Sequence, residues 1–570
     1  MSPSFQPSVA FATSPTAPVA RIKFVEPRVM VKHDECQKAL SIGLFFDGTR
    51  NNRAPYTKAL GYSNIARLYT AYPQMHQEGI FKTYIPGVGT PFPEIGELEH
   101  RTMGSAFALG GTERVLYAIF SLYNSVHGAA FSEKLMFSDK EVEAMCSGKT
   151  DGAQLPSGTL NLGVSSDLRD DSSDGATRQT FLMDQQGRLQ ELLEVESKVK
   201  IVECFIDVFG FSRGAAEARV FCSWFARLLK GGKFAGIPVR FRFLGIIDTV
   251  ASSGFWDGIG NTIVNSTDGH AGWANAKSLM VLPEVENCVH MVAMHELRKN
   301  FPLDEVAIDE VLPPNCQEYV YPGAHSDVGG GYEPGELGIA AGQSQTACDA
   351  QKLSQIPLNH MYECAVAAGV PLSKTLAQKP EHDPFAIAPE VQSAFKTFLQ
   401  ENPSKPQLLS EWMRPFLAWR WQNRDRYTTL RHVKSASADL QLLLDSNAVL
   451  KRDGERLALL ADPAVSDRFV EQARREKRFN LKSPEYRQEQ FSALDPEAPT
   501  VLKQAIAYGA VSPALAEFFD TYVHDSLAGF RKDLVEKTGY WRYRRTFRGD
   551  AMAQLSQREA PGASPVKSSA

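Results

Sequence analysis

Residues 198–216 read KVKIVECFIDVFGFSRGAA, and this stretch decides the fold. Its first half is an apolar, β-branched run, which is typical of a strand buried on both faces of a parallel sheet. The run ends in the pentapeptide GFSRG at 210–214, and alanines and aromatic residues then recur at helical spacing as far as Leu228. The pattern predicts a strand, a tight turn with Ser212 at its apex, and a helix.

The geometry of the turn requires glycine at both ends of the pentapeptide. A sharp turn strains the backbone of the serine, and side chains at Gly210 and Gly214 would collide with the neighbouring strand and helix. In α/β-hydrolases this turn is the nucleophile elbow, which exposes a serine above the sheet. The alternative is an ordinary strand-to-helix turn with a solvated serine, so the interpretation depends on the rest of the chain.

Strand and helix patterns alternate along the first 355 residues. Strands are expected over 39–46, 80–85, 239–247 and 318–321, and helices over 65–72, 115–123 and 288–297. This alternation predicts an α/β fold with a mostly parallel sheet and helices on both faces. Beyond residue 355 the apolar residues recur at helical spacing, over 358–368, 407–426 and 436–478. This spacing predicts a mainly helical C-terminal region.

The patterns divide the 570 residues into four parts. Residues 1–35 are predicted as a disordered leader and 551–570 as a disordered tail. Residues 36–355 are predicted to form an α/β-hydrolase catalytic domain, in which 130–195 is expected as an insertion and a candidate lid. Residues 356–550 form the helical region, a candidate for membrane or partner binding.

The composition excludes several classes of protein. A net charge of −5 gives no bulk attraction to nucleic acid, and no run of 18 apolar residues predicts a transmembrane helix. The N-terminus does not read as a secretory signal, so synthesis in the cytoplasm is expected. The eight cysteines are scattered, which favours free thiols and no zinc. We expect no metal or other cofactor, with Ca²⁺ at Asp47 and Asp327 as the alternative.

A serine nucleophile requires a base to take its proton and an acid to orient that base. In α/β-hydrolases these follow in the order Ser, Asp or Glu, His, each after a strand. Here Asp248 ends the strand over 239–247, and His325 follows the strand over 318–321. Taken alone, Asp248 fits a turn-capping role and His325 a loop histidine bonded to Asp327. Together with Ser212 they predict a catalytic triad.

Two other histidines compete for the role of the base. His295 lies in the run MHELR at 294–298, where a structural role is the simpler interpretation. His524 lies late in the chain, where α/β-hydrolases often place the histidine. We rank His325 first, His524 second and His295 third.

An oxyanion hole requires two backbone N–H groups aimed at the carbonyl oxygen of the substrate. The first is expected at Arg213, directly after the nucleophile. The second is expected in the loop after the first strand, within FFDGTRNN at 45–52, from Gly48 or Thr49. The alternative for this loop is a type I turn stabilised by Asp47.

Five motifs in this order carry a family resemblance: FFDGTRNN, GVGT, FGFSRGAAEAR, GIIDTVAS and PGAHSDVGGGY. Over about residues 38 to 335 the chain resembles the α/β-hydrolase phospholipase effectors of bacterial type VI secretion. The C-terminal part matches loosely, through YVHDSLAGF at 522–530. The resemblance implies Ser212, Asp248 and His325 as the triad and A1 or A2 type hydrolysis of phospholipid esters. It also implies delivery by type VI secretion into the periplasm of a rival cell, a cognate immunity protein and a VgrG-type spike partner.

Two other functions stay open. The chain could be a carboxylesterase or thioesterase on soluble esters, or a binding module that uses the hydrolase fold as a scaffold. The aromatic and basic segment at 539–548 suits an anionic membrane interface, or else packs on its own domain. The aromatic residues Trp412, Phe416, Trp419 and Trp421 are similarly ambiguous, because such stripes are usually core.

Overall fold

The computed structural model describes residues 22–27, 37–53, 61–100, 110–148, 168, 176–197, 199–251, 274, 276–308, 311–401, 409–460, 497–529 and 539–547. The predicted tail and most of the predicted leader lie outside these residues. The described part of the leader is packed rather than disordered, since Val25 is buried and its N–H donates to the carbonyl of Ala368 at 3.2 Å. No helix among the described residues has the length and apolar character needed to span a membrane.

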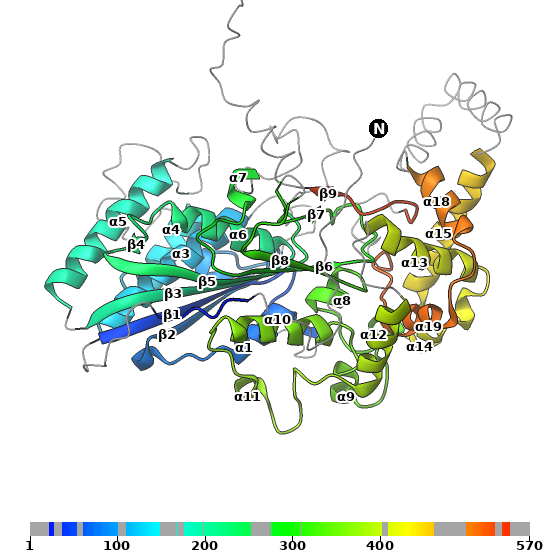
Figure 1. Ribbon diagram of the computed structural model, residues 1–570, viewed down its shortest axis with the longest axis horizontal. Coiled ribbons are helices and arrows are strands. Elements are labelled where there is room, and N and C mark those ends of the chain that lie inside the picture. Colours follow the sequence, from blue (N-terminus) through cyan, green and yellow to red (C-terminus); the bar gives the residue numbers. More distant parts are fainter. Residues whose placement is uncertain are drawn as a thin grey trace, which may run out of the picture.

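A seven-stranded sheet forms the centre of the described structure (Figure 1). Its strands are β1 (Gln37–Phe46), β2 (Ile80–Ile85), β3 (Lys200–Phe211), β4 (Lys233–Phe234), β5 (Ile237–Ile247), β6 (Cys288–Ala293) and β8 (Cys316–Tyr321). The order is β2-β1-β3-β5-β6-β8 with all of these neighbours parallel, and the short β4 pairs antiparallel with β5. The predicted α/β fold with a mostly parallel sheet is therefore confirmed.

The strand order reverses direction between β1 and β3. The chain leaves β1 toward β2 on one side, whereas it leaves β3 toward β5 on the other side. Open α/β sheets bind ligands outside the carboxyl ends of the strands at such a reversal. The loop at 47–53 follows β1 and Ser212 follows β3, so both predicted site segments lie at this reversal.

Helices cover both faces of the sheet (Figure 1). One face carries α3 (Gly111–Ala130), α4 (Asp139–Ser147), α5 (Ala176–Val195) and α6 (Arg213–Ala226), and the other carries α1 (Asn64–Ala71) and α10 (Gln355–Ala367). Side chains of a strand alternate between the two faces. Accordingly, Leu44 and Phe46 of β1 join the apolar core on the α3 side, and Phe45 joins the core on the α1 side.

The C-terminal region is helical, as predicted, and shares a core with the sheet. Its helices are α12 (Pro389–Glu401), α13 (Leu409–Asn423), α14 (Arg431–Ser435), α15 (Leu440–Leu460), α18 (Ala498–Ala507) and α19 (Pro513–Tyr522). The apolar cluster on the α1 side continues into these helices without a break. Trp412, Phe416 and Trp419 are buried in it, so this aromatic stripe is core.

Short elements complete the described structure. The brief α-helices are α7 (Ala276–Leu279), α8 (His325–Gly329), α9 (Gln345–Asp349) and α11 (Lys374–Ala377). Single 3-10 turns occur at His76–Glu78, Pro93–Ile95, Glu336–Gly338 and Tyr427–Thr429. A two-stranded parallel sheet joins β7 (Leu303–Asp304) to β9 (Thr546–Phe547).

One predicted helix is wrong. The stretch 288–297 contains strand β6, which lies between β5 and β8 with all six of its residues buried. A short apolar run that is buried on all sides has no polar face, so periodicity cannot distinguish strand from helix. The valines at 289 and 292 favour the strand because β-branched side chains fit a pleated sheet.

The predicted insertion at 130–195 is partly regular. It contains α4, which begins with a capping box between Ser138 and Glu141, and α5, whose Phe181 and Leu189 are buried in the core. Apart from Leu168, residues 149–175 lie outside the described part of the chain. The lid therefore stays a prediction.

Candidate active site

The turn at Ser212 has the strained geometry that the sequence predicts. Ser212 has φ 58° and ψ −123°, and α6 begins at the next residue. A Cβ atom on Gly210 would lie 2.4 Å from the carbonyl oxygen of Gly214. A Cβ atom on Gly214 would lie 2.4 Å from the carbonyl oxygens of Phe46 and Asp47. The predicted need for both glycines is confirmed, because no side chain fits at either position.

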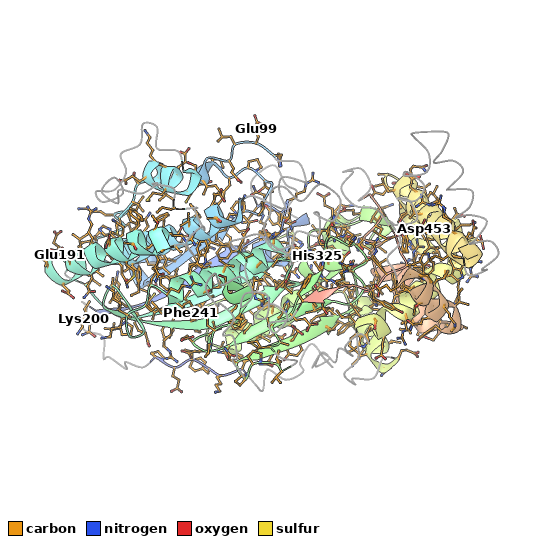
Figure 2. The ribbon with its side chains drawn as sticks, turned by 90° about the horizontal axis from the view of Figure 1, so that it is seen from above. Glu99, Glu191, Lys200, Phe241, His325 and Asp453 are labelled. Atoms are coloured by element: carbon orange, nitrogen blue, oxygen red, sulfur yellow. The ribbon has the colours of Figure 1, made fainter. Side chains whose placement is uncertain are left out.

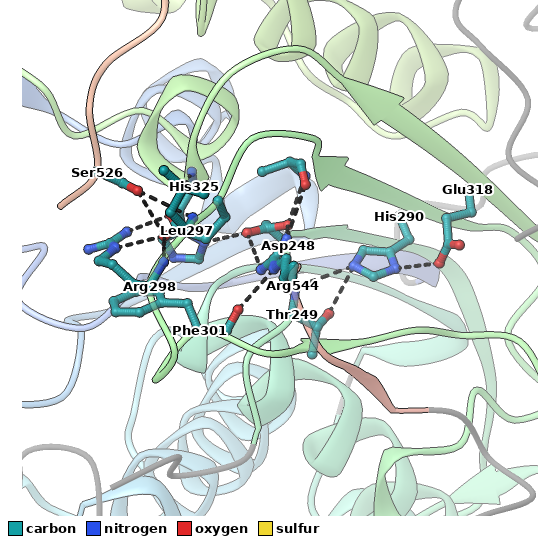
Figure 3. A network of polar contacts seen from close by, with 12 residues as sticks. Asp248, Thr249, His290, Leu297, Arg298, Phe301, Glu318, His325, Ser526 and Arg544 are labelled. Carbon is teal, nitrogen blue, oxygen red and sulfur yellow. Dashed lines mark hydrogen bonds and ion pairs between the residues drawn. The ribbon is translucent and has the colours of Figure 1, made fainter. Parts of the chain in front are cut away.

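Asp248 directly follows β5 and is fully buried. Its Oδ1 accepts from the backbone N–H of Ala293 at 2.8 Å and from Nη1 of Arg544 at 2.6 Å. Its Oδ2 accepts from Nη2 of Arg544 at 2.8 Å and from Nδ1 of His325 (Figure 3). Both carboxylate oxygens are thus held in fixed directions, one of them toward the imidazole.

His325 is the first residue of α8 and lies in the interior, where the sheet meets the helical region (Figure 2). Its ring stacks on Phe211 at a centroid distance of 4.5 Å and meets the edge of Phe301 at 4.9 Å. Its backbone N–H donates to Oε2 of Glu296 at 3.1 Å. Because Nδ1 faces Asp248, Nε2 is the ring nitrogen that can accept a proton from another group.

The electrostatic surroundings keep the acid charged and the imidazole neutral. Burial alone would raise the pKa of Asp248, but Arg544 and His325 together lower this pKa below its ordinary value. Burial lowers the pKa of His325, and the hydrogen bond to Asp248 offsets only part of that effect. At neutral pH the pair is therefore an aspartate and a neutral imidazole, which is the state that a general base requires.

A cavity of about 340 Å³ opens in front of this pair. Ser212 and His325 line the same cavity, as do Thr49, Arg50 and Asn51 from the loop after β1. The helical region also lines the cavity, through Asp439, Leu442, Ser526, Ala528 and Gly529. Both parts of the chain therefore build one cavity at the reversal of the strand order.

The candidate oxyanion donors differ in their surroundings. Arg213 begins α6, and the first N–H groups of a helix have no acceptor within it. The N–H of Gly48 donates to Oδ1 of Asp47 at 2.8 Å, so this donor is already used. Thr49 lines the cavity, and its buried hydroxyl has no hydrogen-bond partner among the described residues. Arg213 and Thr49 are thus the better placed candidates.

The other predicted acids and histidines serve structural contacts. Asp47 accepts from the hydroxyl of Tyr84 at 2.5 Å, and burial raises the pKa of Asp47 to about 6. Asp327 bonds to the ring of His524 at 2.5 Å. His295 accepts from the N–H of Gly323 at 3.0 Å, and burial lowers its pKa to about 3. Among the described residues that line the cavity, His325 is the only histidine.

Sequence reasoning missed two contributions from the end of the chain. Arg544 forms the bidentate ion pair with Asp248 described above. Ser526 donates to Oε1 of Glu296 at 3.0 Å, and the same carboxylate binds Arg298 and the backbone of His325 (Figure 3). The loosely matching motif at 522–530 was the available signal for Ser526. Residues 539–547 are packed, with Tyr540, Trp541 and Arg542 buried, which favours the alternative that this segment packs on its own domain.

No group of three or more His, Cys, Asp or Glu side chains that could hold a metal ion occurs in the described ranges. The seven described cysteines are buried and free, in agreement with the predicted free thiols.

These features define an α/β protein with a strained serine turn and an aspartate–histidine pair at one cavity. Residues 227–364 match the family described as T6SS, phospholipase effector Tle1-like, catalytic domain. The match includes Asp248 and His325 and begins after Ser212. Over these residues the chain is similar to the Tle1-like phospholipase effectors of type VI secretion, and the predicted family resemblance is confirmed.

Solved structures similar to the chain include the following two. The crystal structure of an uncharacterized protein from Pseudomonas aeruginosa has 25% identity and a TM-score of 0.62, over 90% of this chain and 80% of that one. The structure of the Tle1 effector bound to the VgrG spike has 19% identity and a TM-score of 0.32, over 65% and 81%. Only the first similarity extends to the overall fold. No curated protein matches the sequence significantly.

Proposed function

We propose that this chain is a type VI secretion effector with phospholipase activity of A1 or A2 type, which hydrolyses acyl esters with Ser212, His325 and Asp248. The observation that carries the proposal is that Ser212 and His325 line one cavity while Asp248 binds the far side of the imidazole. The family match of residues 227–364 supports the choice of phospholipid over other esters.

In the proposed mechanism the Ser212 hydroxyl attacks the ester carbonyl carbon while Nε2 of His325 takes its proton. Asp248 stabilises the resulting imidazolium, and the N–H groups of Arg213 and Thr49 hold the oxyanion. The tetrahedral intermediate then collapses, and the lysophospholipid oxygen leaves with the proton from His325. Water attacks the acyl-serine with His325 again as base, which releases a fatty acid and restores Ser212.

The cavity supports a substrate that combines apolar and anionic parts. Phe211, Phe301, Leu337 and Leu442 offer apolar walls, whereas Arg50 and Arg298, the latter paired with Glu296, bring two cations to a lining that also contains Glu336 and Asp439. An acyl chain suits the first group and a phosphate suits the second. Delivery to the periplasm of a target cell, a cognate immunity protein and a VgrG-type carrier are further parts of the proposal. They rest on the sequence motifs and the family.

Phosphatidyl vesicles and soluble short-chain esters, tested side by side, examine both the activity and the substrate class. We expect the purified chain to release fatty acid from vesicles faster than it cleaves the soluble esters. Faster turnover of the soluble esters would instead indicate a carboxylesterase or thioesterase. Ser212→Ala is expected to lower the vesicle rate by at least roughly 10³-fold. If purified Ser212→Ala hydrolysed vesicles at the wild-type rate, the serine mechanism would be refuted.

A further inference from the structure

The end of the described chain crosses from the helical region into the catalytic region. We call residues 539–547 the C-terminal strap. Its first part is anchored among the helices, where Tyr540 is buried and Trp541 meets Trp421 edge to face at 5.3 Å. Its last part, β9, pairs in parallel with β7, and the N–H of Leu303 donates to the carbonyl of Arg545 at 2.9 Å. The strap therefore joins the two parts of the molecule.

The strand that receives the strap is itself bound to the loop that carries Asp248. The N–H of Asp304 in β7 donates to the carbonyl of Thr249 at 3.0 Å. The carboxylate of Asp304 accepts from the N–H of Ala251 at 2.7 Å. The strap, β7 and the Asp248 loop thus form a continuous hydrogen-bonded layer.

Arg544 extends from this layer to the candidate acid. Nη1 and Nη2 bind the two oxygens of Asp248 at 2.6 and 2.8 Å, so the ion pair is bidentate. Nε donates to the carbonyl of Phe301 at 2.8 Å, and Nη1 also donates to the carbonyl of Ala293 at 3.2 Å. The planar fork of an arginine fixes both the position and the plane of a carboxylate, which a lysine ammonium cannot do.

The contacts of Arg544 include two of the residues that touch the imidazole, Phe301 and Asp248. Phe301, whose carbonyl it binds, places its ring against His325. Asp248, whose carboxylate it orients, accepts from Nδ1 of the same histidine. Arg544 does not itself line the cavity. Its influence on a substrate therefore passes through Asp248 and His325.

We propose that Arg544 is a positioning residue that keeps Asp248 ionised and aimed at His325, so that the C-terminal strap completes the catalytic site. The proposal rests on the proposed function above and names a further residue for it. A buried carboxylate without a counter-ion is strongly destabilised and takes up a proton. A protonated Asp248 could no longer stabilise the imidazolium of His325.

Other charged groups lie near Asp248 and His325 and also influence the titration of this pair. Glu296 and Arg298 approach His325 from the segment between β6 and β7, and they are bound to each other at 2.9 Å. His290 and Glu318, bound at 2.8 Å, lie behind Thr249 on β6 and β8 (Figure 3). None of these groups belongs to the strap, so variants of Arg544 leave them unchanged.

Two substitutions separate the charge of Arg544 from its geometry. Arg544→Met removes both, whereas Arg544→Lys keeps the charge and loses the bidentate fork. Arg545→Met is the matched control, because it removes the same charge from the adjacent residue, whose side chain is exposed. Circular dichroism and thermal unfolding of the full chains report whether each variant is folded.

The kinetic readout is kcat and KM for vesicle hydrolysis as functions of pH. Arg544→Met is expected to lower kcat by roughly 10- to 100-fold through misplacement of the pair, with KM nearly unchanged. Because a protonated Asp248 no longer favours the imidazolium, the pKa of His325 falls and the acid limb of kcat/KM should move to lower pH. Arg544→Lys should lower kcat but keep the acid limb near that of the wild type. If the role of Arg544 is purely structural, Arg544→Met should reduce the folded fraction without moving the acid limb of kcat/KM.

Histidine titration followed by NMR provides a readout that does not need turnover. In protein labelled with ¹⁵N-histidine, the His325 resonance is assigned with His325→Gln. Its pKa should fall in Arg544→Met, because a protonated Asp248 no longer favours the imidazolium, and stay at the wild-type value in Arg545→Met. An unchanged His325 titration in folded Arg544→Met would overturn the role of Arg544, whatever the activity. Absence of a Ser212 adduct with a fluorophosphonate would instead overturn the proposed function, so the two failures are distinguishable.

Discussion

The backbone N–H of Ser212 donates to the carbonyl of Ile247, the residue before Asp248, at 2.9 Å. On the other side, the carbonyl of Ser212 accepts from the N–H of Val250 at 3.2 Å. The serine turn and the loop that carries the acid are thus bound to each other on both sides of Asp248. The candidate nucleophile and acid owe their relative position to the ends of two adjacent strands, β3 and β5.

Gly214→Ala should damage this turn. The added Cβ would lie 2.4 Å from two carbonyl oxygens at the end of β1, so the helix and the strand must move apart. Overpacking of this kind costs about 1–3 kcal/mol. We expect a lower free energy of unfolding in denaturant titrations and a loss of hydrolysis in the folded fraction.

The matched control is Gly187→Ala, in the middle of α5. A Cβ at Gly187 meets no atom within 4 Å. Alanine favours a helix over glycine by about 0.5–1 kcal/mol, so this variant should be slightly more stable and fully active. Equal stability of the two variants would contradict the close contact between Gly214 and β1.

The activity should fall on the acidic side of neutrality. Burial lowers the pKa of His325 below its ordinary 6.5, so the imidazole stays neutral until the pH falls below that value. Protonation then removes the base, and kcat/KM decreases as the pH falls through the lowered pKa. A pH–rate profile of vesicle hydrolysis measures this limb. A midpoint above pH 6.5 would show that the base is another group or lies in other surroundings.

The three histidines should respond differently to substitution. His325→Ala removes the proposed base and should lower kcat by at least roughly 10³-fold without loss of fold. His524→Ala and His295→Asn alter structural contacts outside the cavity, and Asn retains an acceptor for Gly323. We expect both variants to have a lower melting temperature than the wild type and an unchanged kcat per folded molecule. A selective loss of kcat in His524→Ala would reassign the base.

The stability of the chain should depend on Asp349. This buried carboxylate binds Arg67 at 2.8 Å, Lys352 at 2.7 Å and His382 at 2.8 Å. Burial would raise its pKa, but His382 and Arg67 lower it overall. The contribution of ionised Asp349 to the free energy of unfolding is therefore present above about pH 4. It is lost as the pH falls through the lowered pKa.

Asp349→Asn leaves buried cations without a counter-charge and should cost about 3–5 kcal/mol at neutral pH. Asp425→Asn is the control, because Asp425 pairs with Lys451 on the exposed surface. Its melting temperature should equal that of the wild type. A similarly small decrease in the melting temperature of both variants would contradict the stabilising role of the ion pairs around Asp349.

Much of the fold and of the candidate site was predictable because local patterns carry it. The alternation of apolar strands and helices predicted the parallel sheet, and the glycines around Ser212 predicted the strained turn. Asp248 and His325 followed from the rule that loops after parallel strands meet at one edge. For β6, the same reasoning failed because a run buried on all sides has no periodicity.

The contribution of Arg544 could not be predicted from local patterns. It lies 296 residues from Asp248 along the chain, and only the tertiary fold brings the two together. Its sequence surroundings, WRYRR, suggest a surface that binds anions as readily as a buried segment. The difference arises from the apolar core shared by the helices and the sheet, which buries Tyr540 and Trp541 and brings the strap to β7.

The most direct test of the account is the reaction of the full chain with a fluorophosphonate, followed by peptide mass spectrometry. The account predicts one covalent adduct, on Ser212, which is absent in Ser212→Ala and strongly reduced in His325→Ala. No adduct on Ser212 in the folded wild-type chain would contradict the account and favour a binding module built on a hydrolase fold.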